Sequence, residues 1–287
     1  MSLEISVIIP TCHRDDMLAK CLDCLALGVQ TLPTDQYEVI VTDDGTRSTA
    51  EKMVRAHYPW ARWMAGPKRG PAANRNNGAS FAEGKWLAFT DDDCLPAREW
   101  LNGYSASITK SVLAYEGKIT SDAGTFSPMM EAPINLTGGL FNSCNIMVEK
   151  TLFHHMGGFD EKFPHPAMED WDFHDRILTA GLAVSFVDSA VVNHPPRRCH
   201  WGKQYAKLLE SHSYLWYKQG QTRSFSTSVL IHIMLGRIRR LSKFPTSRDT
   251  LIALASWFAE MCYLVPRVRG WEKKYGNYFS PPRMNTQ

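Results

Sequence analysis

The chain opens with hydrophobic and polar positions arranged in two alternating patterns, one typical of buried strands and one typical of helices. Residues 5–10, Ile-Ser-Val-Ile-Ile-Pro, form an almost continuous apolar run that ends at Pro10. This pattern predicts a strand buried on both faces. Residues 14–27 then carry apolar side chains at helical spacing and stop at Gly28, which predicts a helix packed against that strand.

The same alternation continues through the first third of the chain. Residues 37–42 and 86–90 are two more apolar strand-like runs, and between them residues 48–57 and a segment ending near Gly84 suit helices. This succession predicts an α/β fold with a doubly wound, mostly parallel sheet, in which ligands bind at the carboxyl ends of the strands.

The pattern changes twice further along the chain. Between residues 112 and 196 it is more mixed, and it predicts strands at 144–148 and 183–188 with a helix at 169–180. The remainder is helical in three pieces, which are expected near 200–219, 225–242 and 248–264. We therefore predict one domain over residues 1–196 and a helical C-terminal extension over residues 197–287.

Charge divides the chain at the same point. Residues 1–196 hold 16 Lys and Arg against 25 Asp and Glu, a net charge of −9. Residues 197–287 hold 16 against 4, a net charge of +12, although the whole chain carries only +3. An acidic body and a basic extension indicate that the two parts face different partners.

Composition excludes several classes of protein. A hydrophobic content of 44% with 21% charged residues is typical of a globular domain and not of a disordered or fibrous chain. No apolar run reaches about 18 residues, and no basic and apolar leader opens the chain, so neither a spanning helix nor a secretory signal is expected. Seven scattered cysteines predict free thiols in a reducing cytoplasm.

Acidic clusters follow two of the predicted strands. Asp91, Asp92 and Asp93 come directly after the strand at 86–90. Adjacent carboxylates repel one another unless a cation binds, and Mg²⁺ or Mn²⁺ uses such oxygens together with substrate phosphates, so a metal site is favoured over a solvated acidic turn. Asp43 and Asp44 follow the strand at 37–42 and can accept from a nucleobase or ribose, or simply form a turn.

A third cluster and one histidine complete the candidate chemistry. Glu169 and Asp170, followed by Trp171, begin a predicted helix, where acidic residues are stabilised by the helix dipole. The functional alternative is a general base beside an aromatic platform for a sugar. His194 follows a strand-like run and is a candidate metal ligand. No Gly-x-Gly-x-x-Gly or P-loop motif is present, which removes support for dinucleotide and NTPase functions.

These segments together resemble the family 2 glycosyltransferases, enzymes with the GT-A fold. The resemblance covers roughly residues 4–195 and rests on six motifs in the expected order: Ser-Val-Ile-Ile-Pro-Thr (6–11), Val-Thr-Asp-Asp-Gly-Thr (41–46), Asn-Arg-Asn-Asn-Gly (74–78), Phe-Thr-Asp-Asp-Asp (89–93), Gly-Gly-Phe-Asp-Glu (157–161) and Glu-Asp (169–170). It implies a nucleotide-binding half over about 1–110 and an acceptor half over 111–196.

The resemblance also implies roles for individual residues. Asp170 would be the catalytic base, with Glu169 and Trp171 shaping the acceptor site. Asp93 would bind a divalent cation, Mn²⁺ or Mg²⁺, and His194 would match a metal ligand found in some relatives. The expected donor-binding residues are Pro10, Thr11, Arg14, Asp43, Asp44, Arg75, Asp91 and Asp92, with Arg75 near the base or the phosphates.

The activity implied by the resemblance is a metal-dependent, inverting transfer of a sugar from a nucleotide donor, with UDP the commonest donor base in the family. The Gln-x-x-Arg-Trp motif of processive synthases is absent, which favours addition of one or a few sugars. The alternatives are a sugar-1-phosphate nucleotidyltransferase and a non-catalytic sugar-nucleotide or glycan-binding module. The first lacks its usual Gly-rich basic loop after the strand at 5–10.

The basic extension allows two interpretations. Its predicted helices combine apolar side chains with Arg237, Arg239, Arg240, Lys243 and Arg248, which is typical of attachment to an anionic membrane surface. The same helices could instead pack on the domain with their basic faces in water. No nucleic-acid-binding motif accompanies the charge. With membrane attachment, the acceptor is expected to be a lipid-linked glycan at the cytoplasmic face of the membrane.

Overall fold

The computed structural model describes residues 3–122, 127–198, 202–221, 224–244 and 246–279. Contacts within the chain divide it into two compact units. Unit 1 holds the described residues of 1–123, 132–161 and 169–196, and unit 2 holds those of 124–131, 162–168 and 197–287. Each unit has its own buried core, so each is described separately.

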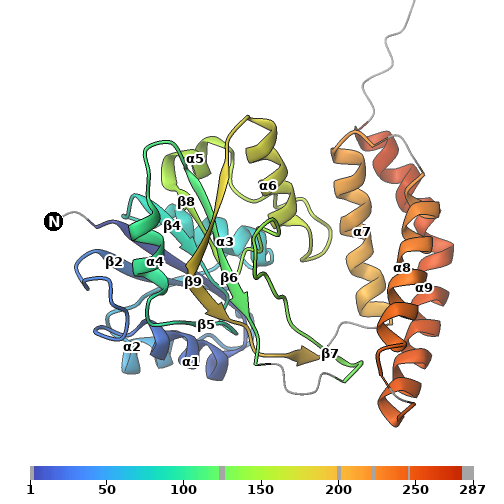
Figure 1. Cartoon of the computed structure of the whole chain (residues 1–287), viewed down its shortest axis with the longest axis horizontal. Coiled ribbons are helices and arrows are strands. Elements are labelled where there is room, and N and C mark those ends of the chain that lie inside the picture. Colours follow the sequence, from blue (N-terminus) through green and yellow to red (C-terminus); the bar gives the residue numbers. More distant parts are fainter. Residues whose placement is uncertain (1–2, 123–126, 199–201, 222–223, 245, 280–287) are drawn as a thin grey trace, which may run out of the picture. The chain divides into compact units, whose positions relative to one another are not determined.

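Unit 1 is built on an eight-stranded mixed sheet with the strand order β3-β2-β1-β4-β8-β6-β9-β5 (Figure 1). Its strands are β1 (Ile5–Thr11), β2 (Tyr37–Asp43), β3 (Arg62–Ala65), β4 (Trp86–Phe89), β5 (Leu95–Pro96), β6 (Ala114–Thr120), β8 (Ile146–Glu149) and β9 (Val184–Asn193). β3, β2, β1 and β4 run parallel, and β6 runs parallel to β9. β8 is antiparallel to both of its neighbours, as is β5 to β9.

The parallel pairing fixes where the site can form. Thr11 at the end of β1 lies beside Asp43 at the end of β2, and Ile8 lies beside Phe89 at the end of β4. The chain then continues from β4 into Asp91–Asp93 at the same edge of the sheet. Side chains separated by tens of residues in sequence therefore meet at the carboxyl ends of three adjacent strands.

Helices cover both faces of this sheet, which confirms the predicted doubly wound arrangement. One face packs against α1 (Asp15–Leu25), α2 (Glu51–His57) and α4 (Trp100–Ser107), and the other against α3 (Pro71–Ser80), α5 (Lys150–His155) and α6 (Glu169–Thr179). β1 shows why both faces are needed, because Val7 and Ile9 belong to the first core and Ile8 to the second. All seven of its residues are buried, as its uninterrupted apolar run predicted.

Five elements of unit 1 were not predicted, and each lacks a simple apolar pattern. β5 has only two residues, Leu95 and Pro96. β3 carries Arg62 at the edge of the sheet, and β6 has Glu116, Gly117 and Lys118 at its centre. α4 contains Gly103, whose lack of a side chain allows close approach to the backbone of Ser189. α5 is only six residues long. Tertiary contacts, and not local periodicity, determine these segments.

Unit 2 consists mainly of the helices α7 (Lys203–Lys218), α8 (Phe225–Leu241) and α9 (Arg248–Phe279), with a two-stranded ladder of β7 (Met130–Glu131) and β10 (Arg197–Arg198). The three helices begin close to their predicted starts. α9 does not end near residue 264 as predicted, because it continues through Pro266. Leu264, Val268, Trp271 and Tyr275 on either side of the proline are all buried in one core, which keeps the helix in place.

α9 also bears on the expectation that no spanning helix exists. Among the described helices it is the one that is long and apolar enough to cross a membrane, judged by length and composition alone. The core helices of soluble proteins can be equally long and apolar. In α9, however, only 22% of the most apolar 18-residue stretch is buried. The expectation drawn from uninterrupted apolar runs is therefore too simple for this helix, because isolated polar residues such as Ser256 and Glu260 interrupt its apolar stretch.

Candidate active site

The end of β1 and the acidic segment after β4 are joined by direct bonds. The Thr11 hydroxyl donates to Asp92 Oδ2 at 2.7 Å, and Arg14 Nη2 lies 2.7 Å from Asp92 Oδ1. Arg14 Nη1 donates to Asp93 Oδ2 at 3.0 Å. Asp92 is fully buried, and this burial raises its pKa to about 7 despite the attraction of Arg14. Of the three aspartates, Asp92 is thus the one that ties the two strands together.

Arg75 connects this edge to the third acidic cluster. It lies on α3 and is buried, with Nη2 donating to Asp91 Oδ1 at 2.6 Å and Nη1 to Glu169 Oε1 at 3.4 Å. Burial disfavours the Asp91 carboxylate, but Arg75 outweighs this effect and lowers the pKa of Asp91. The predicted donor and acceptor residues therefore belong to one cluster, with a single guanidinium between them.

Asp43 and Asp44 shape the backbone around the end of β2. The Asp43 carboxylate accepts from the backbone N–H groups of Gly45 at 2.8 Å and Ala50 at 2.7 Å. The Asp44 carboxylate accepts from the N–H groups of Lys68 at 2.8 Å and Gly70 at 3.0 Å. Both aspartates are buried. Because their carboxylates accept from these backbone N–H groups, the two side chains stabilise the turns as well as lining the strand ends.

Pro10 and Asn74 lie where the ends of β1 and β2 meet. Pro10 is buried in β1 and lies beside Thr42 in the sheet. Asn74, on α3, was part of a motif but was not predicted as a site residue. Its side-chain amide donates to the carbonyls of Thr42 at 2.8 Å and Thr11 at 3.3 Å. Asn74 is buried, and its place at the start of the Asn-Arg-Asn-Asn-Gly motif was the available signal in the sequence.

Glu169 and Asp170 form a crowded pair at the start of α6. Burial, followed by repulsion from Asp170, raises the pKa of Glu169 to about 7, although Arg75 opposes the shift. Burial also raises the pKa of Asp170, whose Oδ2 accepts from Ser143 N–H at 3.2 Å and Oδ1 from Trp171 N–H at 2.9 Å. The Trp171 side chain is 47% exposed, so its ring is open to a ligand.

The loop that carries Ser143 is held by a residue that the sequence analysis missed. Glu116 on β6 is buried, and its carboxylate accepts from the backbone N–H groups of Gly139, Leu140 at 3.1 Å and Phe141 at 2.9 Å. This fixes the path of the chain just before Ser143 meets Asp170. The available signal was a lone carboxylate within a strand otherwise buried on both sides.

Asp93 and His194 form the candidate metal site. Ligand atoms of Asp93, Cys94 and His194 all lie within 4.8 Å of one another. His194 is buried, with Nδ1 3.0 Å from the Pro195 carbonyl, an acceptor, so this nitrogen carries the proton. Nε2 lies 3.6 Å from Asp93 Oδ1, and an imidazole nitrogen and a carboxylate oxygen are both atoms that bind divalent cations.

Cys94 is a weaker candidate ligand than its neighbours. A hydrogen bond with Cys144, together with burial, raises the pKa of its thiol well above the ordinary value. Metals bind the thiolate, which this environment disfavours. Asp93 and His194 therefore stay the candidate metal ligands, and the structure places them close together.

Backbone strain gathers around the same residues. Among the described residues, four non-glycine residues have positive φ: His13, Lys68, Phe141 and Met168. His13 precedes Arg14, the Lys68 N–H binds Asp44, Phe141 is held by Glu116, and Met168 precedes Glu169. Such conformations persist when surrounding contacts enforce them, and they are common at functional sites.

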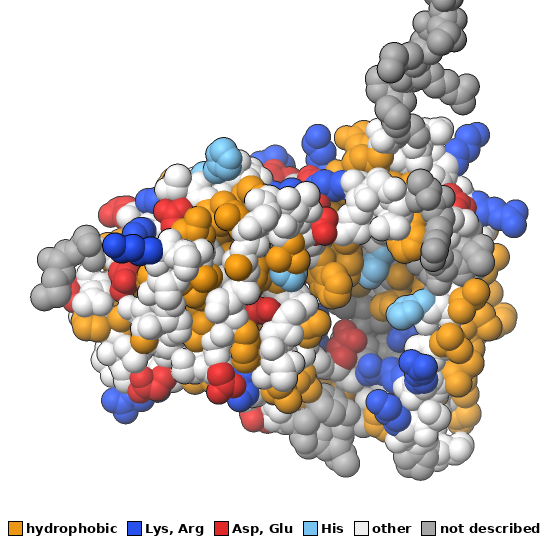
Figure 2. Space-filling view, turned by 45° about the horizontal axis from the view of Figure 1, so that its top comes forward, with side chains coloured by type: hydrophobic (Ala, Val, Ile, Leu, Met, Phe, Trp, Pro, Cys, Tyr) orange, Lys and Arg blue, Asp and Glu red, His pale blue; other side chains and the backbone are white. Residues whose placement is uncertain are grey.

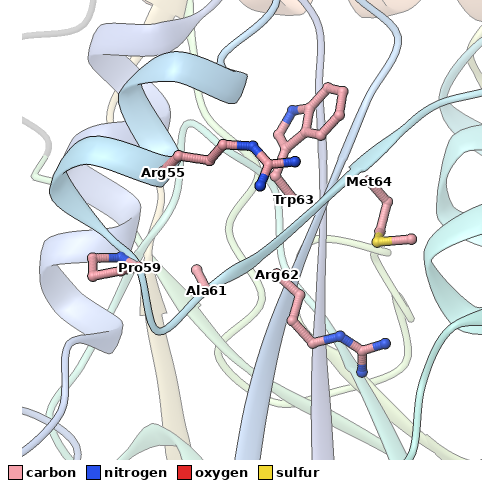
Figure 3. A pocket seen from close by; sticks show the side chains of 6 residues that line it. All are labelled: Arg55, Pro59, Ala61, Arg62, Trp63 and Met64. Carbon is pink, nitrogen blue, oxygen red and sulfur yellow. The ribbon is translucent and has the colours of Figure 1, made fainter.

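A separate pocket lies at the outer strand β3 and contains none of the predicted site residues (Figure 3). It is lined by Arg55, Pro59, Ala61, Arg62, Trp63 and Met64. Both arginines already form ion pairs, Arg55 with Glu51 and Arg62 with Glu38 and Glu83. The residues of this pocket therefore take no part in the cluster of carboxylates at the carboxyl ends of β1, β2 and β4.

Comparison with known proteins gives matches over the whole of this region. The family model described as "Glycosyl transferase family 2" matches residues 6–112, and the model described as "Glycosyltransferase like family 2" matches residues 113–194. Glycosyltransferase AglE of Haloferax volcanii is 28% identical over 210 residues, covering 67% of each chain. The pre-mycofactocin glycosyltransferase of Mycobacterium tuberculosis is 30% identical over 210 residues, covering 64% of this chain and 43% of its own.

Solved structures give the same likeness at the level of the fold. The mannosyltransferase PcManGT from Pyrobaculum calidifontis, in complex with GDP-Man and Mn²⁺, superposes with a TM-score of 0.56 at 18% identity, covering 97% of this chain and 85% of its own. S. aureus TarS 1-349 in complex with UDP also has a TM-score of 0.56 at 18% identity, covering 96% and 90%.

The position of Arg75 predicts a pH-dependent effect on stability. Replacing it by methionine (Arg75→Met) leaves Asp91 and Glu169 buried without their cation, so we expect a loss of roughly 3–5 kcal/mol in the free energy of unfolding. The loss should be larger near pH 8 than near pH 5.5, because Glu169, with its pKa of about 7, is mostly neutral at the lower pH and then gains little from Arg75.

Urea unfolding at the two pH values measures this difference. Arg55→Met is the matched control, because Arg55 is exposed and forms its ion pair with Glu51 on the same helix. An equal loss at both pH values would contradict the proposed coupling of Arg75 to Glu169.

Proposed function

The chain belongs to family 2 of the glycosyltransferases, enzymes that use nucleotide-sugar donors, and on this basis we propose that unit 1 is a metal-dependent, inverting enzyme that adds one sugar per encounter. The solved relatives confirm the GT-A fold expected from the sequence. The observation that carries the proposal is the position of Arg75 between Asp91 and Glu169, which joins a donor carboxylate to the residue that directly precedes the candidate base Asp170.

The donor would bind at the carboxyl edge of the sheet. Pro10, Thr11, Asp43 and Asp44 surround the ends of β1 and β2, where the nucleoside would lie. Asp91 would contact the ribose or the sugar. Among the solved structures with this fold, PcManGT holds GDP-Man and TarS holds UDP, and we propose a UDP-sugar for this chain. Arg14 and Asp92 support this edge through their mutual ion pair.

Asp93 and His194 would hold the divalent cation, which, when bound, neutralises charge on the nucleoside diphosphate leaving group. The imidazole ligand favours Mn²⁺ over Mg²⁺, because Mg²⁺ prefers oxygen ligands. PcManGT was solved with Mn²⁺, which agrees with this choice. The Pro195 carbonyl fixes the proton of His194 on Nδ1 and leaves Nε2 able to coordinate.

Asp170 would act as the general base. It takes the proton of the acceptor hydroxyl, whose oxygen forms a bond to the anomeric carbon while the bond from that carbon to the diphosphate oxygen breaks. Attack from the side opposite the leaving group inverts the anomeric configuration. The Ser143 N–H holds one oxygen of Asp170 in place, and the raised pKa makes this carboxylate a stronger base than an exposed aspartate.

The acceptor we propose is a lipid-linked glycan or glycolipid used in cell-surface polysaccharide synthesis, met at the cytoplasmic face of the membrane. The exposed Trp171 offers a flat apolar face on which a sugar ring can stack. The basic composition of residues 197–287 supports a peripheral position beside anionic lipid. A nucleotidyltransferase gains no support, because Arg14 after β1 is paired with Asp92 and Asp93.

The role of Asp170 predicts a separation of binding from transfer. Asp170→Asn removes the proton acceptor but keeps the size of the side chain, so we expect transfer to fall by about 10²–10⁴-fold while nucleotide and Mn²⁺ affinities change little. Transfer is measured as nucleoside diphosphate release, and binding by calorimetry. Asp175→Asn on the same helix is the control. Transfer that survives in Asp170→Asn would place the base elsewhere.

The pairing of Glu169 with Asp170 predicts a second change in the pH profile. The base must be ionised, so kcat/KM should rise with pH through an acid limb set by the raised pKa of Asp170. Burial and repulsion from Asp170 raise the pKa of Glu169 to about 7, so a second change in the profile is expected near pH 7, where Glu169 ionises beside the base. Glu169→Gln should remove this second change, whereas Asp188→Asn, an exposed carboxylate on β9, should leave it in place. A change near pH 7 that persists in Glu169→Gln would show that Glu169 does not cause it.

The role of His194 predicts weaker metal binding without loss of the fold. His194→Ala removes one of two protein ligands, so we expect the affinity for Mn²⁺, measured by electron paramagnetic resonance in the presence of UDP, to fall at least tenfold. His57→Ala, at an exposed helix end, should bind Mn²⁺ as the wild type does. Unchanged affinity in His194→Ala would remove the histidine from the metal site.

A further inference from the structure

Unit 2 exposes large apolar side chains on two of its helices. On α8 these are Ile231, Met234, Leu235 and Ile238, and on α9 they are Leu251, Ile252, Leu254, Phe258 and Val265. Together they are called the apolar ridge below. Phe258 is 73% exposed and Leu251 60%, values that are unusual for side chains of this size in water.

The ridge on α9 is a regular face of the helix. Leu251, Leu254, Phe258 and Val265 recur at intervals of three, four and seven residues, which places them on one side. The buried positions Ala253, Glu260, Leu264 and Val268 follow the same rhythm on the opposite side. α9 therefore has one apolar side packed in the core of unit 2 and a second apolar side directed outwards. Figure 2 shows hydrophobic side chains along the outer edge of this helical unit.

Charge is absent along this outward side and concentrated at its ends. From Thr250 to Pro266, about 25 Å of helix, the sequence has one charged residue, Glu260. That residue is fully buried and accepts from Arg237 Nη2 at 2.8 Å. Exposed Arg248 begins the helix, and exposed Arg267 and Arg269 follow the apolar stretch. The ridge on α9 is thus bounded by cations at both ends.

We infer that the apolar ridge is a membrane-docking surface, which lies in the interface of a bilayer leaflet that contains anionic lipid. Its apolar side chains would enter the boundary between headgroups and acyl chains, and the flanking arginines would contact lipid phosphates. The arginines at the two ends of the ridge argue against a second copy of the chain as the partner that covers it. Two ridges packed together, parallel or antiparallel, would bring arginines beside arginines, whereas anionic lipid neutralises them.

The packing of α9 favours a position along the membrane surface over a position across the bilayer. By length and composition alone α9 could cross, because 17 residues without an exposed charge run from Thr250 to Pro266. Its inner side packs against α7 through a core that includes Leu209 and Tyr214 of α7 and Leu264 of α9. Because one face of α9 is buried in the core of unit 2 and the opposite apolar face is exposed, the helix is suited to lie along a membrane surface. This inference is independent of the transfer chemistry and specifies how the proposed enzyme would reach a lipid-linked acceptor.

Vesicle flotation tests the inference on the full chain. The probes are vesicles of phosphatidylcholine alone and of phosphatidylcholine with phosphatidylglycerol. We expect the wild type to float with the anionic vesicles, and the variant Leu251→Gln/Leu254→Gln/Phe258→Gln to bind them at least tenfold more weakly. The control Met17→Gln/Leu27→Gln/Val29→Gln changes three exposed apolar residues of unit 1 and should bind as the wild type does. Circular dichroism checks that each variant is folded.

Two further measurements cover a failure of the ridge variant to fold. Arg248→Gln/Arg267→Gln/Arg269→Gln should lose the preference for anionic vesicles. A bimane label on the exposed Cys262, four residues after Phe258, should be quenched by brominated lipid, with Cys12, Cys24 and Cys199 changed to serine so that they do not take up the label. Equal flotation of wild type and ridge variant, or an unquenched label, overturns the inference. So does light scattering that shows a wild-type dimer that the ridge variant dissociates, since a second copy would then cover the ridge.

Discussion

The crowding of carboxylates at one edge of the sheet is the physical constraint on which the rest of unit 1 depends. Asp91–Asp93, Glu169 and Asp170 are drawn together, and Arg14 and Arg75 supply the compensating charge. Burial, together with repulsion between the carboxylates, still raises the pKa of both Asp92 and Glu169 to about 7, so the two guanidinium groups do not fully compensate these side chains. A divalent cation that brings a nucleotide with it would relieve the same constraint and supply the chemistry.

The scaffold holds this unfavourable arrangement through contacts made at a distance. Parallel pairing aligns the ends of β1, β2 and β4, and Asn74 links the carbonyls of the first two. Glu116 fixes the loop that delivers the Ser143 N–H to Asp170. The residues with positive φ lie beside these contacts, so local strain is maintained by the surrounding structure.

Sequence reasoning succeeded where a single local signal determined the structure. The runs at 5–10, 37–42 and 86–90 predicted strands, the first of them buried on both faces, and the parallel order predicted that both acidic clusters would lie at the carboxyl ends of the strands. It failed for β6 and Glu116, because that carboxylate is explained by backbone groups more than twenty residues away. The sequence could not identify the groups that bind Arg75 for the same reason. In a linear motif, phosphates, Asp91 and Glu169 are equally plausible partners of this guanidinium.

Calorimetric titration with UDP, in the presence and absence of Mn²⁺, tests the central claim most directly, with GDP, TDP and CDP for comparison. If the carboxylate edge is a donor site that requires a cation, one nucleotide should bind tightly with Mn²⁺ and at least tenfold more weakly without it. Equal binding with and without the metal would contradict the account of Asp93 and His194. Binding of none of the four nucleotides under either condition would contradict the donor site itself.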